Sequence, residues 1–364
     1  MIGFVIAMAV IAATFQFYIL EHGLEGLDYS LELEKYLAEP QEVVGMSSVI
    51  CNQKRMMLPS LRIRENLPDG VCIHESLKGK ESQGDGIFQR AYLETRLYLA
   101  GWQKVEIQRK VSFSKRGSYR FPEVSLDAGD FLGITSKRKM AEGRVEIVVK
   151  PEPSQNVQMQ QLLGGFLGNV SVRRFWMEDP MIPAGFREYT GREAFRDISW
   201  THSARCGTWM VKEYDHTADL SCLVLLDISC REVWKKDMEE RTEECFSMAR
   251  TVCEMLEERD FSYEFMTNAV VQGPLGTVQG VWQGKGKIHL EEILEILGRA
   301  THHFGDHLPS LLHYAEAKRG ENRTCILISL EEWRECQEEI LHLRNMTGYE
   351  VLSLYPQAAI EEDQ

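Results

Sequence analysis

The sequence lacks the short motifs that mark several common kinds of active site. Its 364 residues contain no Walker A loop and no dinucleotide-binding glycine fingerprint, which excludes nucleotide binding by those routes. None of the nine cysteines forms a CxxC pair or stands at zinc-ligand spacing, which excludes the usual structural zinc site. An odd number of scattered cysteines is typical of reduced thiols, so we expect the folded part to be cytoplasmic.

The sequence also lacks a surplus of basic residues. Lys and Arg together number 41 against 55 Asp and Glu, which gives a formal net charge of -14. Phosphate binding needs a concentrated basic surface, so this balance disfavours a nucleic-acid partner. Hydrophobic residues make up 44% of the chain, which is ordinary for a folded protein and argues against extensive disorder.

Charged side chains and proline are absent from residues 1–20. A helix of that length spans about 30 Å of hydrocarbon, so the segment predicts a single-pass transmembrane anchor and a cell-membrane location, with the bulk of the chain in the cytoplasm. The alternative is a cleaved signal peptide, which would have a basic region before a shorter apolar segment.

The rest of the chain divides into an all-β part and an α/β part. Residues 27–150 contain short runs that alternate polar and apolar residues, which predict a β-sandwich-like domain. Residues 151–180 begin with two prolines and predict a connector.

Residues 181–364 alternate strand-like and helix-like segments, which predicts an α/β fold with a mainly parallel, Rossmann-like sheet. Leu220–Leu226 is a continuous apolar run of strand length, and a long amphipathic helix follows it. No helical pattern separates residues 261–266 from residues 277–282, so we expect these two runs to form a hairpin at the sheet edge.

A dense charged and aromatic stretch precedes the apolar run. It resembles the signature of the bacterial domain-of-unknown-function 58 family in a set of spaced positions: Arg187, Glu188, Tyr189, Gly191, Arg196, Ile198, Trp200, Ser203, Ala204 and Arg205. A second resemblance to that family covers Arg116-Gly117-x-Tyr119 and Asp130–Gly133, for which turn chemistry is a sufficient explanation.

The resemblance implies a von Willebrand A-like domain in the second half of the chain. It also implies a MoxR-type AAA+ ATPase as partner, with this chain as adaptor or substrate receptor in the assembly or remodelling of envelope-associated proteins.

The signature residues have two interpretations. In the structural one, the arginines pair with Glu188, Glu193 and Asp197, and Trp200 packs beneath the sheet. In the other they form a partner-binding surface, because Arg, Tyr and Trp supply most binding hot spots. Both remain open at this point.

Asp227 and Ser229 follow the apolar run and are candidate ligands for Mg²⁺, because the carboxyl ends of parallel strands form ligand sites. The von Willebrand A-like fold that the resemblance implies would place a further serine ligand at the position of Arg231 and an aspartate near Leu330, and neither residue is present. The ligand count therefore weighs against a cation, and the prediction is a chain without a cofactor.

Two other groups of residues could carry chemistry. His303 and His307, with His302 and His313 nearby, would share a face if they lay on one helix, although Pro309 indicates that a helix starts only near His307. His202, Ser203 and Cys206 lie close in sequence without a catalytic motif around them. The sequence thus predicts a non-enzymatic interaction protein; the alternative is a metal-dependent adhesion module or hydrolase that uses Asp227, Ser229 and the histidines.

Overall fold

The computed structural model describes residues 4, 14, 16–18, 21–75, 86–89, 92–129, 135–142, 145–176, 183–191, 195–214, 221–230, 236–273, 280–317, 324–331, 340–341 and 350–356. The chain divides into two compact units. The first contains residues 1–152, 272–274 and 294–300, and the second contains residues 153–271, 275–293 and 301–364.

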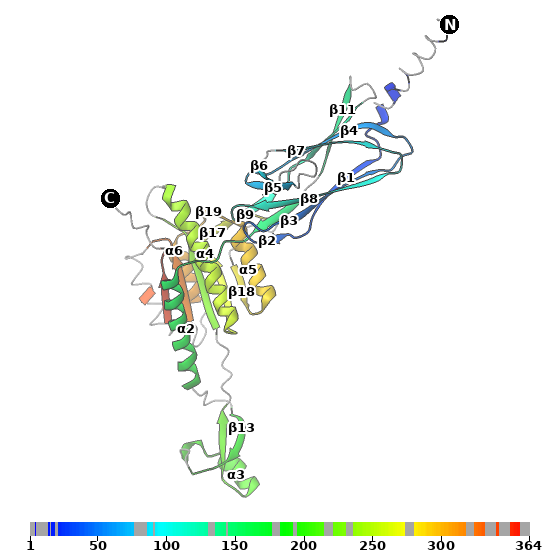
Figure 1. The fold of residues 1–364 in the computed structure, drawn as a ribbon. Coiled ribbons are helices and arrows are strands. Elements are labelled where there is room, and N and C mark those ends of the chain that lie inside the picture. Colours follow the sequence, from blue (N-terminus) through cyan, green and yellow to red (C-terminus); the bar gives the residue numbers. More distant parts are fainter. Residues whose placement is uncertain are drawn as a thin grey trace. The chain divides into compact units, whose positions relative to one another are not determined.

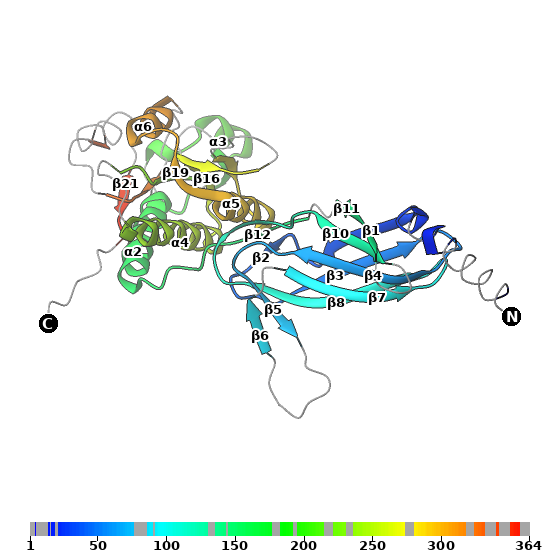
Figure 2. The ribbon, with the colours of Figure 1, turned by 90° about the horizontal axis from the view of Figure 1, so that it is seen from above.

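The first unit is built from three β-sheets (Figures 1 and 2). One five-stranded sheet has the order β1 (Leu27–Leu33), β3 (Val44–Asn52), β8 (Lys104–Phe113), β5 (Val71–Glu75), β6 (Gly86–Gln89). A four-stranded sheet has the order β11 (Ser136–Ala141), β10 (Val124–Gly129), β4 (Leu58–Asn66), β7 (Tyr92–Leu99). A small third sheet contains β2 (Leu37–Ala38), β12 (Glu146–Val149) and β9 (Gly117–Arg120).

The two larger sheets share a hydrophobic core. Leu27 and Ile50 of the five-stranded sheet are buried with Leu61, Ile63 and Leu126 of the four-stranded sheet. In β3 every second residue is buried, from Val44 to Asn52. Such alternation places one face of a strand in the core and the other outside, as the sequence of this part of the chain predicts.

A buried ion pair also joins these two sheets. Arg109 of β8 donates from Nη1 to Glu65 Oε2 of β4 over 2.7 Å, and only 4% of the Glu65 side chain is exposed. Tyr29 donates its hydroxyl to Glu65 Oε1 over 2.7 Å, and Ser48 donates to the same oxygen over 2.5 Å. Burial, with the nearby Glu65 carboxylate, raises the pKa of Tyr29 well above its ordinary value. The interior of the sandwich therefore contains a hydrogen-bonded ion pair, Glu65–Arg109, that connects the two sheets.

Arg116 and Tyr119, from the second family-like stretch, make local contacts within the first unit. Arg116 Nη1 donates to the carbonyls of Leu297 over 2.7 Å and Ala300 over 2.5 Å, at the end of helix α5 (Lys287–Arg299). A cation suits the last carbonyls of a helix, which carry partial negative charge. Tyr119 donates its hydroxyl to Lys115 O over 2.8 Å. Asp130–Gly133 lie outside the described residues.

The second unit contains a five-stranded sheet with the order β18 (Gly280–Gly284), β16 (Ser262–Thr267), β15 (Ser221–Asp227), β20 (Thr324–Ser329), β21 (Glu350–Leu354). The predicted strand at Leu220–Leu226 is confirmed as β15, which lies at the centre of this sheet and is almost wholly buried. The predicted hairpin is also confirmed in that β18 pairs antiparallel with β16, with a bulge between Tyr263 and Phe265.

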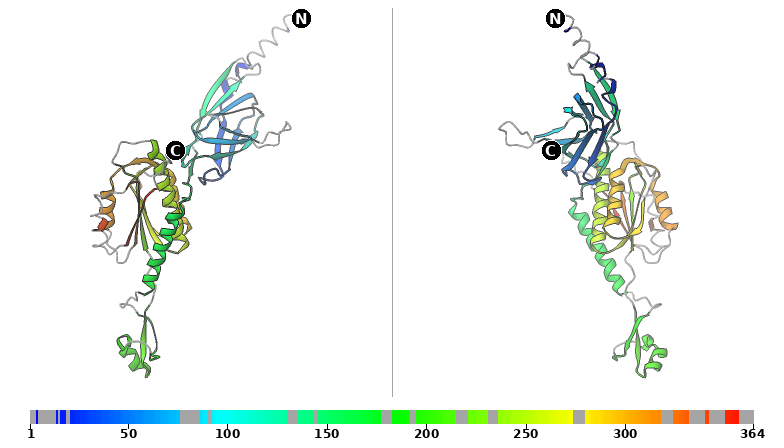
Figure 3. Two further views of the ribbon diagram at one scale, coloured as in Figure 1. Left: turned by 60° about the vertical axis from the view of Figure 1, so that its left-hand side comes forward. Right: turned by 90° about the vertical axis from the view of Figure 1, so that its right-hand side faces the viewer.

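Helices cover both faces of this sheet (Figure 3). Helix α4 (Lys236–Glu258) is the predicted long amphipathic helix, and its buried residues include Phe246, Val252 and Leu256. Helix α6 (Leu308–Ala317) packs Leu308, Leu311 and Leu312 against β15 and β20. The described cysteines are free thiols, and burial raises the pKa of Cys325 to about 12.

The connector contains regular structure that the sequence did not predict. Residues 157–176 form helix α2 (Val157–Trp176). Met159, Leu163, Leu167 and Val170 are buried at helical spacing, although Gly164 and Gly165 interrupt the apolar pattern. The two glycines made the helix hard to recognise from the sequence alone.

The predicted fold class is wrong. Strands make up 45% of the described residues and helices 29%, so this part of the chain is mainly β, with a β-sandwich as its larger regular feature. The sheet of the second unit is mixed, because β18 enters it antiparallel. Two further short strands, β17 (Ala269–Val271) and β19 (Ala300–Phe304), pair outside that sheet. The expectation of a von Willebrand A-like domain in residues 181–364 is therefore wrong as well.

The predicted anchor and cell-membrane location are corrected as well. Among the described residues, the structure has no helix whose length and apolar character suit a membrane span. Most of residues 1–20, on which the prediction rested, lie outside the described residues.

Candidate functional site

The family-like residues gather in a small lobe formed by residues 183–191 and 195–214, here called the signature lobe (Figure 1). Strand β13 (Pro183–Glu188) pairs antiparallel with β14 (Met210–Tyr214), and between them lie the 3₁₀ turn η1 (Phe195–Asp197) and helix α3 (Trp200–Cys206). Among its described residues, the buried apolar side chains are those of Ile198 and Val211, which face each other in an isolated bridge.

Ser203 holds the lobe together. Its hydroxyl donates to Ser199 O over 2.8 Å and accepts a hydrogen bond from Met210 N over 2.8 Å. Gly207, in the left-handed conformation with φ 72°, ends α3 by donating its N–H to Ser203 O. The serine of the Ser203-Ala204-Arg205 element therefore has a structural role, in joining α3 to β14.

The possible nucleophile-and-base group does not form. His202 Nδ1 lies 3.2 Å from Ser199 Oγ, and its ring stacks on Phe186 with 3.6 Å between centroids. The Ser203 hydroxyl is engaged with backbone groups, and Cys206 is exposed at the end of α3. A catalytic hydroxyl or thiol needs a base within hydrogen-bond reach, and the contacts of His202 supply no base to Ser203 or to Cys206.

Aromatic rings gather on the surface of the lobe. Tyr189, Phe195 and Trp209 form a mutual cluster, with ring centroids 5.6 to 6.1 Å apart. Phe195 is 63% exposed and Trp209 is 52% exposed. Trp200 is also 63% exposed, so it does not pack beneath a sheet as the structural interpretation required.

The other signature residues belong to the same lobe. Arg187 and Glu188 are exposed on β13, and Gly191 follows with a φ of 89°. Arg196 is in η1, and Arg205 is exposed in the last turn of α3. Arg192 and Glu193 lie outside the described residues. The structure thus brings the described signature positions onto one small lobe.

Asp227 and Ser229 belong to a separate buried polar network at the end of β15. Asp227 Oδ1 accepts hydrogen bonds from Ser229 N over 3.0 Å, Ser229 Oγ over 2.5 Å and Asn268 Nδ2 over 2.6 Å. Asp227 Oδ2 accepts from Ser329 Oγ over 2.8 Å. All four side chains are fully or almost fully buried. Both carboxylate oxygens are therefore satisfied by protein donors.

Asn268 organises this network, and sequence reasoning did not identify it. Its side chain donates to Asp227 and to Asp306 O, and its Oδ1 accepts from Ile228 N over 2.9 Å. Its backbone carbonyl accepts from Gly305 N. One asparagine thus fixes the loops that follow β15, β16 and β19. Its position directly after a buried strand was the only available signal.

The network contains oxygen atoms of the kind that Mg²⁺ prefers, but they are arranged to bond one another. Arg231, which the sequence places where a ligand would be needed, lies outside the described residues. No group of three or more His, Cys, Asp or Glu side chains in the described part of the chain is arranged to hold a metal. The geometry favours a structural role for Asp227 and Ser229.

The histidines do not share a helical face. His302 and His303 lie in β19, whereas α6 begins only at Leu308. His302 Nε2 bonds Glu243 Oε1 over 2.7 Å, and His307 contacts the Phe304 ring. The helical i, i+4 arrangement of His303 and His307 is therefore wrong, because the local chain forms a strand and a loop.

No protein-family model and no curated protein matches the chain. Among solved structures it is similar to the CARDB domain of the PF1109 protein from Pyrococcus furiosus, with 11% identity over 34% of this chain and 86% of that one, and a TM-score of 0.22. It is also similar to a non-cellulosomal cohesin from Archaeoglobus fulgidus, with 13% identity over 37% of this chain and 97% of that one, and a TM-score of 0.24.

A third similar structure is a type II cohesin domain from the cellulosome of Acetivibrio cellulolyticus, with 12% identity over 34% of this chain and 94% of that one, and a TM-score of 0.24.

Proposed function

We propose that the chain is a non-enzymatic interaction protein and that the signature lobe is its contact surface for a partner protein. The observation that carries this proposal is the exposure of Phe195, Trp200 and Trp209 on one small lobe. Tryptophan and its neighbouring aromatic residues are enriched among the side chains that dominate binding energy.

The small core of the lobe supports the same conclusion. Ile198 and Val211 are the buried apolar residues among its described positions, while three larger aromatic side chains remain in water. Burying an aromatic side chain removes about 150 to 250 Å² from water. A partner that covers these rings would therefore supply more apolar burial than the lobe provides for itself.

For the partner we propose a MoxR-type AAA+ ATPase, on the strength of the resemblance at Arg187–Arg205 to the domain-of-unknown-function 58 family. In that arrangement the chain acts as an adaptor or substrate receptor, and the ATPase supplies the energy for remodelling a third protein. No reaction is assigned to the chain itself. Asp227 and Ser229 contribute by keeping the sheet edge ordered.

Co-purification tests the proposal. Full-length chain and its cognate MoxR-type ATPase are expressed together, and the complex is captured through a tag on the ATPase. We expect the unaltered chain to co-purify and the double variant Arg196→Ala/Trp200→Ala to be lost from the complex. Equal recovery of the unaltered chain and the double variant, or no recovery of either, would count against the proposal.

A further inference from the structure

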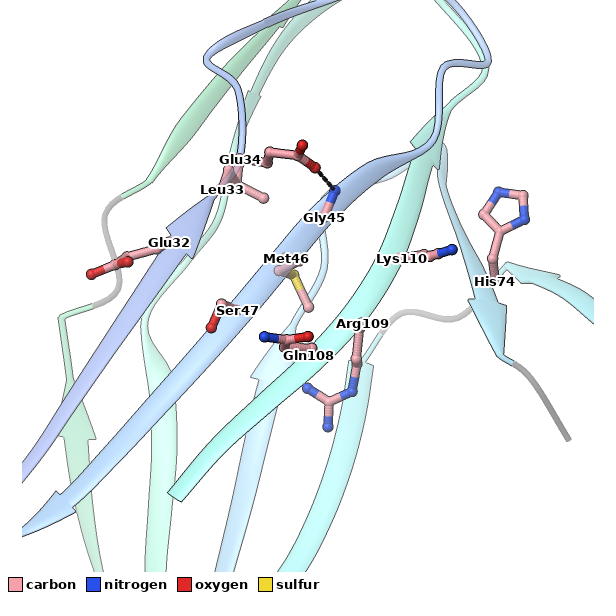
Figure 4. A pocket seen from close by; sticks show the side chains of 10 residues that line it. All are labelled: Glu32, Leu33, Glu34, Gly45, Met46, Ser47, His74, Gln108, Arg109 and Lys110. Atoms are coloured by element: carbon pink, nitrogen blue, oxygen red, sulfur yellow. Dashed lines mark hydrogen bonds between the residues drawn. The ribbon is translucent and has the colours of Figure 1, made fainter. Parts of the chain in front are cut away.

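The five-stranded sheet of the first unit carries a hollow of about 800 Å³ whose lining combines charged and polar side chains with apolar ones (Figure 4). Its lining comes from β1, β3, β5 and β8 and from Glu34, directly after β1. The volume lies within the range of small-molecule sites, which is roughly 300 to 1,000 Å³. This hollow is independent of the signature lobe.

Strand register places its side chains in two rows across the sheet. In one row, Glu34 N donates to Gly45 O, Gly45 is opposite Lys110, and Lys110 is opposite His74. In the next row, Glu32 is opposite Ser47 and Ser47 is opposite Gln108. Paired residues of neighbouring strands project from the same face, so these side chains surround one region.

Gly45 forms the floor of the hollow. Its φ is not among the positive values that would require a glycine. A Cβ added there would lie 2.9 Å from Glu34 Oε2, because the Glu34 carboxylate lies over Gly45 and accepts a hydrogen bond from Gly45 N over 3.2 Å. Neighbouring strands are about 4.8 Å apart, and the backbones that carry Glu34 and Lys110 are therefore separated by roughly 10 Å.

The two sides of the hollow carry opposite charge. Glu32 and Glu34 lie on one side of Gly45, and Lys110 and His74 lie on the other (Figure 4). Among the described residues, neither Glu32 nor Lys110 is joined to an opposite charge by an ion pair. Two unpaired charges of opposite sign across a gap match a ligand that has a cation at one end and an anion at the other.

We propose that this hollow binds a zwitterionic ligand of the short-peptide class. The ammonium group lies against Glu32 and Glu34, and the carboxylate lies against Lys110 and His74. Ser47 Oγ and Gln108 Nε2 both donate to Glu106 Oε1 over 2.9 Å in the structure, and in the complex they turn to the amide groups of the ligand. The backbones of Glu34 and Lys110 are roughly 10 Å apart, which is close to the length of three extended residues at about 3.3 Å each.

Triglycine is the probe for this site, because it has both terminal charges and no side chains. Calorimetry on the full-length chain compares triglycine with N-acetyl-triglycine, which lacks the cation, and triglycine amide, which lacks the anion. We expect triglycine to bind, and each blocked peptide to bind at least about tenfold more weakly. Absence of triglycine binding, or equal binding of the blocked peptides, would overturn the proposal.

Two variants locate the binding. Gly45→Val fills the floor of the hollow and Lys110→Glu reverses one wall, so each is expected to weaken triglycine binding at least about tenfold. Lys104→Glu, an exposed position at the start of β8, is the matched charge reversal and leaves the affinity unchanged. Lys110 is exposed, so Lys110→Glu keeps the fold even if Gly45→Val does not. An unchanged affinity in Lys110→Glu would contradict the site.

Discussion

The hydroxyl of Ser203 accepts a hydrogen bond from the backbone N–H of Met210 over 2.8 Å, and this contact fastens α3 to β14. The same hydroxyl donates to Ser199 O, so both of its roles are used inside the signature lobe. The exposed Trp200 directly follows Ser199 in the sequence, and the exposed Trp209 directly precedes Met210. The hydrogen bonds of Ser203 therefore hold in place the segments that carry the exposed aromatic side chains.

Replacing Ser203 with alanine should loosen the lobe. The Met210 N–H would lose its partner in a largely buried position, which destabilises the local structure by about 1 to 3 kcal/mol. Hydrogen exchange measured by mass spectrometry should show faster exchange in residues 199–211 and no change in the first unit. Thr201→Ala, on the exposed side of α3, is the control. Equal protection in both variants would show that Ser203 does not hold α3 in place.

Replacing Asn268 with alanine should destabilise the second unit. The change removes a donor to the buried Asp227 carboxylate and leaves Ile228 N without its acceptor. Losing a hydrogen bond to a buried charged group costs about 1.5 to 3 kcal/mol. Urea unfolding monitored by the second unit measures the effect, and Gln283→Ala, an exposed position on β18, is expected to change stability by less than about 0.5 kcal/mol. A similar loss in both variants would contradict the proposed role of Asn268.

The ion pair between Glu65 and Arg109 should show strong coupling. Arg109→Met leaves the Glu65 carboxylate buried without its cation, and breaking such a pair from one side typically costs about 3 to 5 kcal/mol. Adding Glu65→Gln to Arg109→Met removes the unpaired charge, so the double variant is expected to be more stable than Arg109→Met alone. Chemical unfolding of the unaltered chain, Arg109→Met, Glu65→Gln and the double variant gives the coupling free energy directly. Additive losses would mean that the two groups act independently.

The ion pair between Asp127 and Arg138 predicts a dependence of stability on pH. A hydrogen bond from Arg138 lowers the pKa of Asp127 below its ordinary value. The folded state thus favours the ionised carboxylate, and its contribution is complete above the ordinary aspartate pKa of about 3.9 and is lost as the pH falls through the lower folded-state value. The Arg138 side chain is 62% exposed, so screening limits the contribution to about 0.5 to 1 kcal/mol.

Asp127→Asn should accordingly be less stable than the unaltered chain at neutral pH, with a difference that shrinks in acid. Urea unfolding at about pH 7 and about pH 3 makes the comparison. Asp260→Asn, from the exposed pair Asp260–Lys285, serves as a control with little effect at neutral pH. A difference for Asp127→Asn that stays constant across this range would rule out ionisation as its source.

The parts of the fold that follow from periodicity could be predicted from the sequence. Alternation identified the strands of the first unit, and a continuous apolar run identified β15 at the centre of its sheet. Helix α4 has apolar residues at helical spacing, and it was predicted for that reason. Helix α2 was not predicted, because Gly164 and Gly165 interrupt its apolar pattern.

The remaining errors have physical causes. A charged residue in a strand, such as Glu65 or Arg109, looks solvent-facing unless the opposite sheet is known, so the buried pair was invisible to the sequence. Asn268 carries no motif, and only the folded chain brings it to Asp227. The von Willebrand A-like fold was inferred from a family resemblance in a short stretch, which does not determine the strand content of the whole chain. The membrane anchor was inferred from the apolar length of residues 1–20 alone.

We propose that the aromatic cluster of the signature lobe is the surface that binds the AAA+ ATPase. The most direct test is the dissociation constant of the purified complex, measured by calorimetry for the unaltered chain and for the double variant Phe195→Ala/Trp209→Ala. Trp102→Ala is the control, because the Trp102 side chain is 70% exposed in the first unit. The account predicts at least about tenfold weaker binding for the double variant, which is about 1.4 kcal/mol, and no change for the control. Equal dissociation constants for the double variant and the unaltered chain would contradict it.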